Sequence, residues 1–315
     1  MPLIEVPASA TTGELIRWAA QLFEAARIPR PTHDARVLLA HACGSDPGEL
    51  HADEELIARQ REMFIALAQR RARREPIEHL IGYATFRRLK LAVGPGVYVP
   101  RAETETLVEL AIGEIRDQRA NGHVTPILAA DLCTGSAVIP LAVATEAGDV
   151  EMHAVEREPA AVAWARKNLD AYSVQLLRVG SCVGVVTADV SSVVAVEFAG
   201  LRGRCDIVTS NPPYIPESGQ PRVPEVRLFD PKTAVYAGHD GMDVIRAVIA
   251  AGAGLLHSGG AIFIEHGPDQ GEHYDSNESG QIGVPALLRA SPHFAEVRDH
   301  TDTSGLPAVT TARRR

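Results

Sequence analysis

The stretch ILAADLCTGSAVIPLAVATEA, residues 127–147, contains the parts of one α/β unit in order. ILAADL is a short apolar run typical of a buried strand, Gly135 suits a tight turn, and AVIPLAVATEA has the composition of a helix. The alternation continues with EMHAVE, PAAVAWARKNLDAY, VGVVTAD and CDIVTS, and then with a helix over 242–256 and the strand AIFIEH. Strands and helices that alternate in this way predict an α/β fold with a doubly wound, mostly parallel sheet.

The residues before this sheet have helical periodicity. Thr12 is placed to cap a helix whose apolar residues share one face, Pro29 and Pro31 interrupt the pattern, and Thr32 is placed to open a second helix. A third helical region runs through Leu56, Ile57, Phe64, Ile65 and Leu67. We therefore expect an N-terminal all-α domain at residues 1–82.

Alternation of polar and apolar residues replaces the helical pattern after this domain. FRRLKLAV, GPG and VYV, within residues 86–99, predict a β-hairpin, which we assign to a linker at 83–100. A helix around 104–115 then opens the larger domain, residues 101–315.

The composition excludes several classes of protein. A length of 315 residues with 45% hydrophobic residues indicates a globular protein, and no apolar run reaches the roughly 18 residues of a membrane helix. The four cysteines lie far apart and the histidines form no HExxH motif, so the sequence predicts neither disulfides nor a metal site. We expect a cytoplasmic monomer without membrane contact.

Charge argues against a protein that binds nucleic acid through its phosphates. The formal net charge is −9, whereas phosphate binding requires a basic face, so we expect no stable nucleic-acid complex. The local basic run RRARR, residues 70–74, is a candidate surface for docking a protein partner.

The tetrapeptide NPPY, residues 211–214, ends the strand CDIVTS with two prolines that cannot continue it. The side-chain oxygen of Asn211 can accept one N–H of a planar amide or amine, and the Pro212 carbonyl can accept the other. Tyr214 can pack on the flat face of such a group. The pattern favours a site that holds an NH₂ group still in front of an electrophile.

Other strand ends supply candidate ligand contacts, because ligands bind at the carboxyl ends of parallel strands. The turn after the first strand has Gly135 where a dinucleotide fingerprint has three glycines, so a phosphate cradle is not expected. Glu156 ends the next strand, at about the 20-residue spacing where a carboxylate accepts hydrogen bonds from ribose hydroxyls. Asp189 and Glu265 end two later strands.

Together these residues resemble class I S-adenosylmethionine-dependent methyltransferases, and within them the release factor glutamine methyltransferases (HemK/PrmC). The resemblance spans nearly the whole chain and rests on EPIEHLIGYATF, VYVPRAETE, DLCTGSA, SNPPYIP, DGMDVIRAVI and GLPAVTTAR. It implies a Rossmann-like, seven-stranded sheet, and methyl transfer without metal to the N5 amide nitrogen of a protein glutamine. The implied substrate is the GGQ loop of a class I peptide chain release factor, docked by the helical domain.

The resemblance also implies roles for residues. It implies that Asn211, Pro212 and Tyr214 are catalytic, and that the same residues together with Pro213 hold the glutamine amide. S-adenosylmethionine would be bound by Cys133, Thr134, Gly135, Ser136, Ala137, Glu156, Asp189, Val190 and Asn211.

Some positions depart from the family pattern. Cys133 and Ala137 replace the outer glycines of a GTGSG loop, Pro140 follows in the next helix, and an acidic insertion occupies residues 271–281. We expect weaker cofactor binding if Ala137 adopts a positive φ, and no effect from Cys133 if its φ is negative. Three alternatives stay open: an adenine or guanine N-methyltransferase of nucleic acid, a paralogue acting on another protein, and a non-catalytic binding module.

Overall fold

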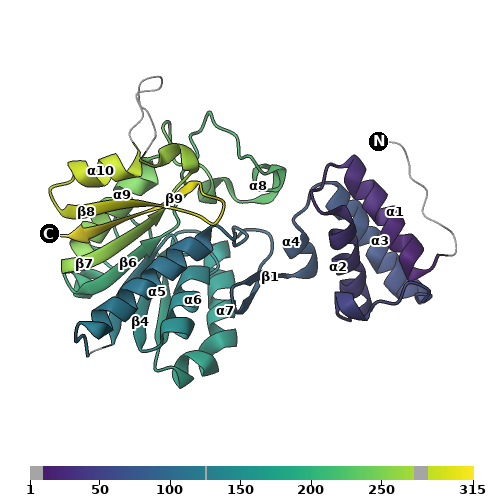
Figure 1. The fold of residues 1–315 in the computed structure, drawn as a ribbon, viewed down its shortest axis with the longest axis horizontal. Coiled ribbons are helices and arrows are strands. Elements are labelled where there is room, and N and C mark those ends of the chain that lie inside the picture. The colour runs from purple at the N-terminus through teal and green to yellow at the C-terminus, as the bar shows by residue number, and fades with distance from the viewer. Residues whose placement is uncertain (1–9, 125, 273–282) are drawn as a thin grey trace. The chain divides into compact units, whose positions relative to one another are not determined.

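The computed structural model describes residues 10–124, 126–272 and 283–315. They form two compact units (Figure 1). The helical unit comprises Met1–Tyr83 together with Arg222–Phe229, and the sheet unit comprises Ala84–Pro221 and Asp230–Arg315. The acidic insertion noted in the sequence lies, from residue 273 onward, outside the described residues.

Five α-helices build the helical unit within the described residues: α1 (Thr12–Ala25), α2 (Pro31–Cys43), α3 (Ala58–Ala72), α4 (Ile77–Ile81) and α8 (Pro224–Phe229). Their shared core contains fully buried side chains from three of them, Leu15, Phe23, Leu38, Leu39 and Phe64. The predicted all-α composition of this region is confirmed.

The helix starts differ slightly from the sequence expectation. Thr11, not Thr12, caps α1: the Thr11 side chain accepts the Glu14 amide hydrogen at 3.4 Å, and the Glu14 carboxylate accepts from the Thr11 amide at 2.9 Å. Thr12 instead donates its hydroxyl hydrogen to the Glu54 carbonyl. Helix α2 begins at Pro31 rather than at Thr32. Proline suits the first position of a helix because the amide hydrogen that it lacks would have no partner within the helix there.

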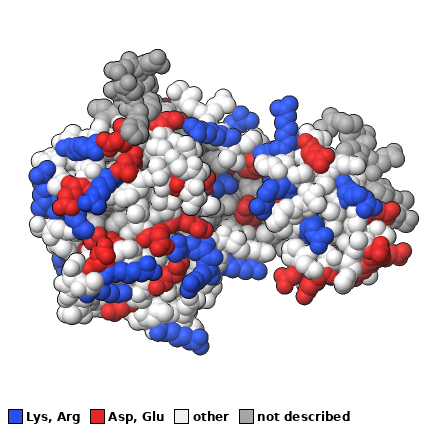
Figure 2. Space-filling view, viewed as in Figure 1, with Lys and Arg blue, Asp and Glu red and all other residues white. Residues whose placement is uncertain are grey.

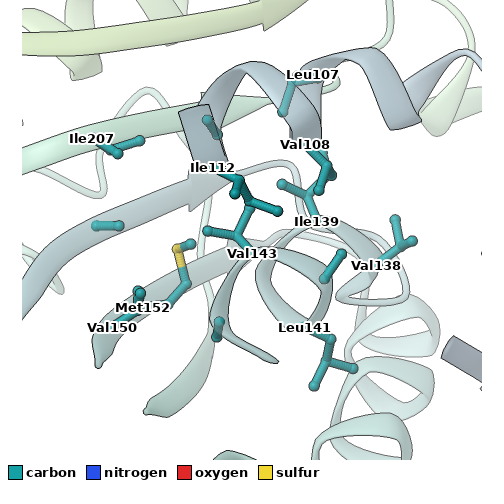
Figure 3. Packing of buried hydrophobic residues seen from close by; sticks show 14 of the residues in the cluster. Leu107, Val108, Ile112, Val138, Ile139, Leu141, Val143, Val150, Met152 and Ile207 are labelled. Atoms are coloured by element: carbon teal, nitrogen blue, oxygen red, sulfur yellow. The ribbon is translucent and has the colours of Figure 1, made fainter. Parts of the chain in front are cut away.

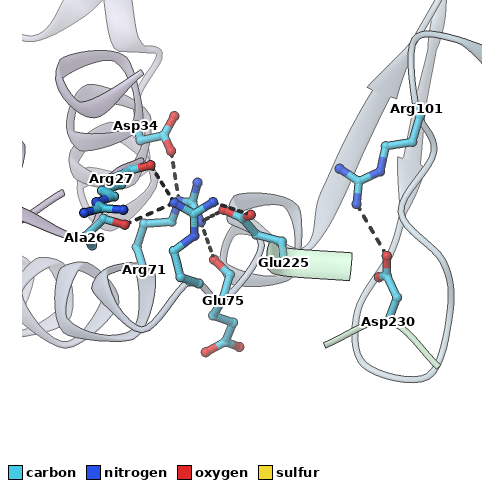
Figure 4. A network of polar contacts seen from close by, with 9 residues as sticks. Ala26, Arg27, Asp34, Arg71, Glu75, Arg101, Glu225 and Asp230 are labelled. Atoms are coloured by element: carbon cyan, nitrogen blue, oxygen red, sulfur yellow. Dashed lines mark hydrogen bonds and ion pairs between the residues drawn. The ribbon is translucent and has the colours of Figure 1, made fainter. Parts of the chain in front are cut away.

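Two arginines of the basic run lie inside the helical unit. Arg71 is only 5% exposed and donates to Asp34 at 2.9 Å and to Glu225 at 2.8 Å (Figure 4). Arg74 donates to the other oxygen of Glu225 at 2.6 Å. Burial alone would raise the pKa of Glu225, but the hydrogen bonds from both arginines lower it below its ordinary value. The prediction that Arg71 presents its charge to a partner is therefore wrong, because that charge is buried and paired.

The sheet unit contains a seven-stranded sheet in the order β5-β4-β3-β6-β7-β9-β8. The strands are β3 (Ile127–Leu132), β4 (Val150–Glu156), β5 (Cys182–Thr187), β6 (Cys205–Ser210), β7 (Leu256–Glu265), β8 (Phe294–Thr301) and β9 (Pro307–Arg314). The first five in this order pair in parallel, and β9 runs antiparallel to both β7 and β8. The predicted doubly wound, mostly parallel sheet is confirmed.

Helices cover both faces of the sheet (Figure 1). They are α5 (Thr104–Ala120), α6 (Val138–Ala147), α7 (Pro159–Arg178), α9 (Asp243–Leu255) and α10 (Val284–Ala290). Successive residues of a strand serve opposite cores: Ala129 and Ile207 pack with α5 and α6, whereas Ala130 and Val208 pack with α9. Figure 3 shows the first core, where α5 and α6 meet the sheet. Burial on both faces explains the continuous apolar runs in the sequence.

The hairpin is shorter and lies earlier than the sequence indicates. β1 (Tyr83–Phe86) pairs with β2 (Leu89–Ala92), and the turn falls between them, before the GPG sequence. The glycines of GPG serve close packing instead. A Cβ on Gly94 would lie 2.6 Å from the Trp164 ring, and one on Gly96 would lie 2.9 Å from Ala160, both on α7. The hairpin prediction is correct in kind and wrong in the position of its turn.

Surface charge is mixed on the face that Figure 2 shows, with acidic and basic side chains interspersed over both units. Among the described residues, no helix has the length and apolar character needed to cross a membrane.

Candidate active site

Hydrogen bonds to β3, the neighbouring strand, fix the end of β6, from which the NPPY tetrapeptide extends. Thr209 donates its hydroxyl hydrogen to the Asp131 carboxyl at 2.6 Å, and Ser210 donates to the Leu132 carbonyl at 2.7 Å. All of these groups are buried. The tetrapeptide therefore starts from a rigid point in the middle of the sheet.

The Asn211 side chain has a defined orientation. Its Nδ2 donates to Thr104 Oγ1 at 3.1 Å and to Glu265 Oε1 at 2.9 Å. Thr104 is the first residue of α5, and Glu265 is the last residue of β7. No hydrogen bond between described residues uses Asn211 Oδ1, which leaves this oxygen able to accept an N–H from a ligand.

The other end of the tetrapeptide is held from the loop after β7. Gln270 donates a side-chain hydrogen to the Tyr214 carbonyl at 2.9 Å and accepts the Gly267 amide at 3.1 Å. A Cβ on Gly267 would lie 3.4 Å from the Tyr214 ring, an ordinary van der Waals distance, so the ring lies close beside this loop. Pro212 is buried between these two anchored ends. The tetrapeptide is thus tied down at both termini.

Neutral aromatic hydroxyls lie beside this loop. Burial raises the pKa of Tyr98 to about 12, and the charge of Arg101 opposes that rise. Burial also raises the pKa of Tyr214 well above its usual value, and Tyr98 and Glu265 add to the rise. The Arg101 guanidinium lies over the Tyr98 ring, 5.5 Å from its centre. Arg101 also pairs with Asp230 (Figure 4). Both phenols therefore stay protonated at neutral pH.

Glu265 is a buried carboxyl beside Asn211. Burial raises the pKa of Glu265 to about 8, the charge of Glu103 adds to the rise, and the hydrogen bond from Asn211 opposes it. Its second oxygen, Oε2, is buried without a hydrogen-bond partner among the described residues. This carboxyl therefore holds its proton to a higher pH than an exposed glutamate does, although hydrogen bonds from Thr104 and Asn211 oppose the rise.

The loop after β3, residues 133–137, has three positive φ angles; we call it the cofactor loop. They are 63° at Cys133, 55° at Gly135 and 64° at Ala137. The last of these residues is the N-cap of α6, in left-handed conformation. Cys133 and Ala137, which replace the two outer glycines of the family pattern, thus both have a backbone conformation that is strained for a residue with a side chain. Cys133 does not have the negative φ under which we expected it to have no effect.

Glu156 lies directly against the cofactor loop. Its Oε2 accepts the Gly135 amide hydrogen at 2.9 Å, and its Oε1 accepts the Glu158 amide hydrogen at 2.9 Å. Each carboxylate oxygen can accept a further hydrogen bond, so Glu156 retains the acceptor capacity that the predicted ribose contact requires.

Asp189 lies at the surface, two residues after β5 ends at Thr187. Hydrogen bonds from the Ser191 hydroxyl and amide, at 2.6 and 2.8 Å, lower its pKa. Val190 beside it is buried. The negative charge of Asp189 therefore lies next to the buried apolar side chain of Val190.

Several polar atoms around the cofactor loop are poised for a ligand. Asp131 Oδ2, Thr134 Oγ1 and Ser136 Oγ are buried and have no hydrogen-bond partner within the described part of the chain. A Cβ built on Gly135 would meet no atom within 4 Å, so space is open in front of the loop. These features fit S-adenosylmethionine, whose methionine part carries an ammonium and a carboxylate and whose ribose carries two hydroxyls. The described residues contain no cluster of acidic, histidine or cysteine side chains arranged for a metal ion.

The predicted residues lie at the ends of four neighbouring strands: Asp189 and Val190 after β5, Glu156 at the end of β4, the cofactor loop after β3 and the NPPY tetrapeptide after β6. A hydrogen bond joins Glu156 to the cofactor loop, and the bond between Asp131 and Thr209 links β3 to β6. Their roles stay predictions. Sequence reasoning assigned no role to Thr104, Glu265 or Gln270. A signal existed only for Glu265, which ends a strand on the ligand-binding edge of the sheet.

Comparisons with known proteins agree with this geometry. Residues 14–82 match the PrmC N-terminal domain, and residues 120–224 match the methyltransferase small domain. A release factor glutamine methyltransferase of Streptomyces coelicolor is 39% identical over 94% of this chain and 95% of its own length. One from Corynebacterium glutamicum is 39% identical over 81% of this chain and 85% of its own length. A 4-amino-L-phenylalanine/4-methylamino-L-phenylalanine methyltransferase of Streptomyces pristinaespiralis is 34% identical over 83% of this chain and 81% of its own length.

Proposed function

Because the chain belongs to the release factor glutamine methyltransferase family, we propose that it methylates the N5 amide nitrogen of a protein glutamine, the GGQ glutamine of a class I peptide chain release factor. The methyl donor in this proposal is S-adenosylmethionine, with no metal. The observation that carries the proposal is the orientation of Asn211, whose Nδ2 is held by two buried side chains while Oδ1 remains able to accept a hydrogen bond.

In this reaction the protein acts mainly by positioning the glutamine amide in front of the methyl group. When bound, S-adenosylmethionine supplies a methyl group that its positively charged sulfur has already activated. Asn211 Oδ1 and the Pro212 carbonyl would accept the two hydrogens of the glutamine NH₂, which fixes the amide plane so that one of its faces is turned to the methyl group. The new N–CH₃ bond would form as the S–CH₃ bond of the donor breaks, and the nitrogen would then release one hydrogen as a proton. Tyr214, protonated and half-buried, lies against the flat amide. Holding the nucleophile in one geometry removes an entropic barrier without requiring a general base.

The residues around the cofactor loop would hold the donor. Glu156 would accept hydrogen bonds from the ribose hydroxyls, and the loop from Cys133 to Ala137 would lie against the methionine part. Asp189 and Val190 would contact the base. The buried atoms without partners, Thr134 Oγ1 and Ser136 Oγ among them, support this assignment, because buried polar atoms in proteins nearly always have a hydrogen-bond partner.

The helical unit would provide the docking surface for the release factor, since one glutamine offers little area for binding. Buried Arg71 is excluded from that surface. We further propose that the protein acts as a monomer in the cytoplasm, without stable nucleic-acid or membrane contact, and that the domains divide at residues 82 and 100.

Methylation of purified substrates tests the proposal. The wild-type protein, with labelled S-adenosylmethionine, should label an intact class I release factor but not the same factor with its GGQ glutamine replaced by alanine. Asn211→Ala should abolish labelling while cofactor affinity stays within several-fold, because the cofactor loop is untouched. Labelling of ribosomal RNA or DNA in place of the release factor would overturn the assignment.

A second candidate substrate is favoured by one relative. The Streptomyces pristinaespiralis enzyme is named for an aromatic amine, which also presents a planar NH₂ group. 4-Amino-L-phenylalanine therefore belongs in the same assay. A release factor that remains unlabelled while this amine is methylated would assign the chain to small-molecule methylation.

A further inference from the structure

We propose that Thr104 and Glu265 are positioning residues that select one of the two orientations of the Asn211 amide, so that Oδ1, and not Nδ2, faces the methyl acceptor. The kinetic consequence rests on the proposed function. The orientation itself does not, and it can be measured without any substrate.

An asparagine amide is nearly symmetric in shape but not in hydrogen bonding. A 180° rotation about its last side-chain bond exchanges an acceptor oxygen for a donor NH₂ group in almost the same position. In the rotated state, Asn211 would present N–H groups to the N–H groups of the substrate, and the acceptor could not bind in the reactive geometry. The reaction therefore depends on an amide that does not rotate.

The two contacts distinguish these orientations. Asn211 Nδ2 has two hydrogens, and the structure provides one acceptor for each, Thr104 Oγ1 at 3.1 Å and Glu265 Oε1 at 2.9 Å. Rotation would place Oδ1 against these two oxygens and would break both hydrogen bonds from Nδ2. Oδ1 could then accept a hydrogen only from a protonated Glu265 or from a Thr104 hydroxyl withdrawn from Glu265, so at least one buried hydrogen bond is lost overall. A lost buried hydrogen bond costs on the order of 1–3 kcal/mol, so the observed orientation should dominate by at least about fivefold.

Both contacts come from rigid parts of the sheet unit. Thr104 is 1% exposed at the start of α5, whose following residues Leu107 and Val108 are fully buried in the core. Glu265 is 4% exposed at the end of β7, a strand paired on both sides. Asn211, in contrast, begins a segment without regular secondary structure. Two well-packed residues thus set the orientation of the Asn211 side chain.

Hydrogen exchange of the Asn211 side chain tests the orientation directly. In protein labelled with ¹⁵N at asparagine, the signal missing from Asn211→Ala identifies the Asn211 NH₂ group. Its hydrogens should exchange with solvent at least about tenfold more slowly than those of an exposed asparagine, and Thr104→Val should remove most of that protection. Exchange in the wild type as fast as in an exposed side chain would overturn the proposal, whatever the substrate is.

Kinetics with the release factor tests the consequence. Thr104→Val, which keeps the side-chain shape, should lower kcat by about 10- to 100-fold, with S-adenosylmethionine affinity and KM within about threefold. Thr104→Ser restores the hydroxyl and should recover most of the rate. Thr106→Val is the matched control, because it makes the same change on the same helix at a side chain with no hydrogen bond recorded among the described residues.

Glu265 gives an independent pair of variants. Glu265→Gln retains an acceptor oxygen and should keep most of the activity, whereas Glu265→Leu removes it and should match Thr104→Val. Equal activity of Thr104→Val, Thr104→Ser and wild type would refute the positioning role. A wild type that methylates no release factor would instead refute the proposed function, and the exchange experiment would still decide the orientation.

Discussion

Two substitutions in the cofactor loop, Gly135→Ala and Ala137→Gly, distinguish the effect of backbone strain on stability from the effect of ligand contact on binding. Gly135 and Ala137 both have positive φ, at 55° and 64°. A side chain in this conformation costs about 1–2 kcal/mol, while the greater freedom of glycine in the unfolded chain offsets about 0.4–1 kcal/mol. Gly135→Ala should therefore lower the free energy of unfolding by about 1 kcal/mol, with no packing gain, because its Cβ would meet no atom within 4 Å.

Ala137→Gly should behave differently although it relieves the same strain. The Ala137 side chain is fully buried, and removing its methyl group costs about 0.8 kcal/mol of apolar burial. The substitution gains stability from the relief of strain, and loses stability from the missing burial and from the greater freedom of glycine in the unfolded chain. These contributions nearly cancel, so the free energy of unfolding should change by less than about 1 kcal/mol. Urea denaturation of the two variants without cofactor measures both values.

Cofactor binding completes the comparison. A Cβ at position 135 would project into the open space in front of the loop, so Gly135→Ala should weaken S-adenosylmethionine binding at least about tenfold, which is about 1.4 kcal/mol. Ala137→Gly should leave affinity equal or improved. Calorimetry gives both constants. Wild-type affinity in Gly135→Ala would refute the idea that the donor lies against this face of the loop, and a gain of 2 kcal/mol or more in the stability of Ala137→Gly would show that strain had been underestimated.

Three further predictions follow from buried charges and carboxylates. Glu156→Ala should weaken S-adenosylmethionine binding by about 1–3 kcal/mol in calorimetry, and unchanged affinity would contradict its ribose contact. The folded-state pKa of Glu265, about 8, lies above the ordinary value of 4.5, so the folded protein retains a proton that the unfolded chain releases. The contribution of this group to stability is fully present below pH 4.5 and is lost progressively as the pH rises to about 8. Glu265→Gln should therefore make the slope of unfolding free energy between pH 5 and 7 less negative by up to about 1.4 kcal/mol per pH unit, whereas an identical slope would count against the raised pKa. Arg71→Met leaves buried Asp34 without its arginine and Glu225 with Arg74 alone, and should cost about 3–5 kcal/mol in denaturant unfolding. Arg70→Met, at a half-exposed ion pair, should cost less than about 1 kcal/mol, and equal losses would refute the structural role of Arg71.

The sequence predicted those elements whose pattern is local. β3 and β6 are recognisable because both faces of the central sheet are buried and each strand has an apolar centre, 128–130 in β3 and 207–208 in β6. The GPG glycines were misassigned for the opposite reason: their cause is the approach of Trp164 and Ala160, which a helix more than 60 residues away provides. A glycine needed for a turn and a glycine needed for close packing look the same in one sequence.

The residues of the candidate site also differ in whether a local motif in the sequence could identify them. Asn211, Glu156 and the cofactor loop could be found because each follows a strand in a recognisable motif. Thr104 and Gln270 could not, since their importance comes from hydrogen bonds to residues far away in the chain, at Asn211 and Tyr214. A threonine at the start of a helix is ordinary until the fold brings an asparagine to it.

Helix α8 makes the helical unit discontinuous in the chain. The polypeptide leaves the sheet unit after Pro221, contributes Glu225 to the buried pairs with Arg71 and Arg74, and returns at Asp230. Cutting the chain once near residue 83 would therefore not yield a complete helical unit, and would leave in the remainder a helix whose buried carboxylate has lost both arginines. An exchange of this unit between relatives would have to transfer two segments, with residues 222–229 accompanying the N-terminal helices.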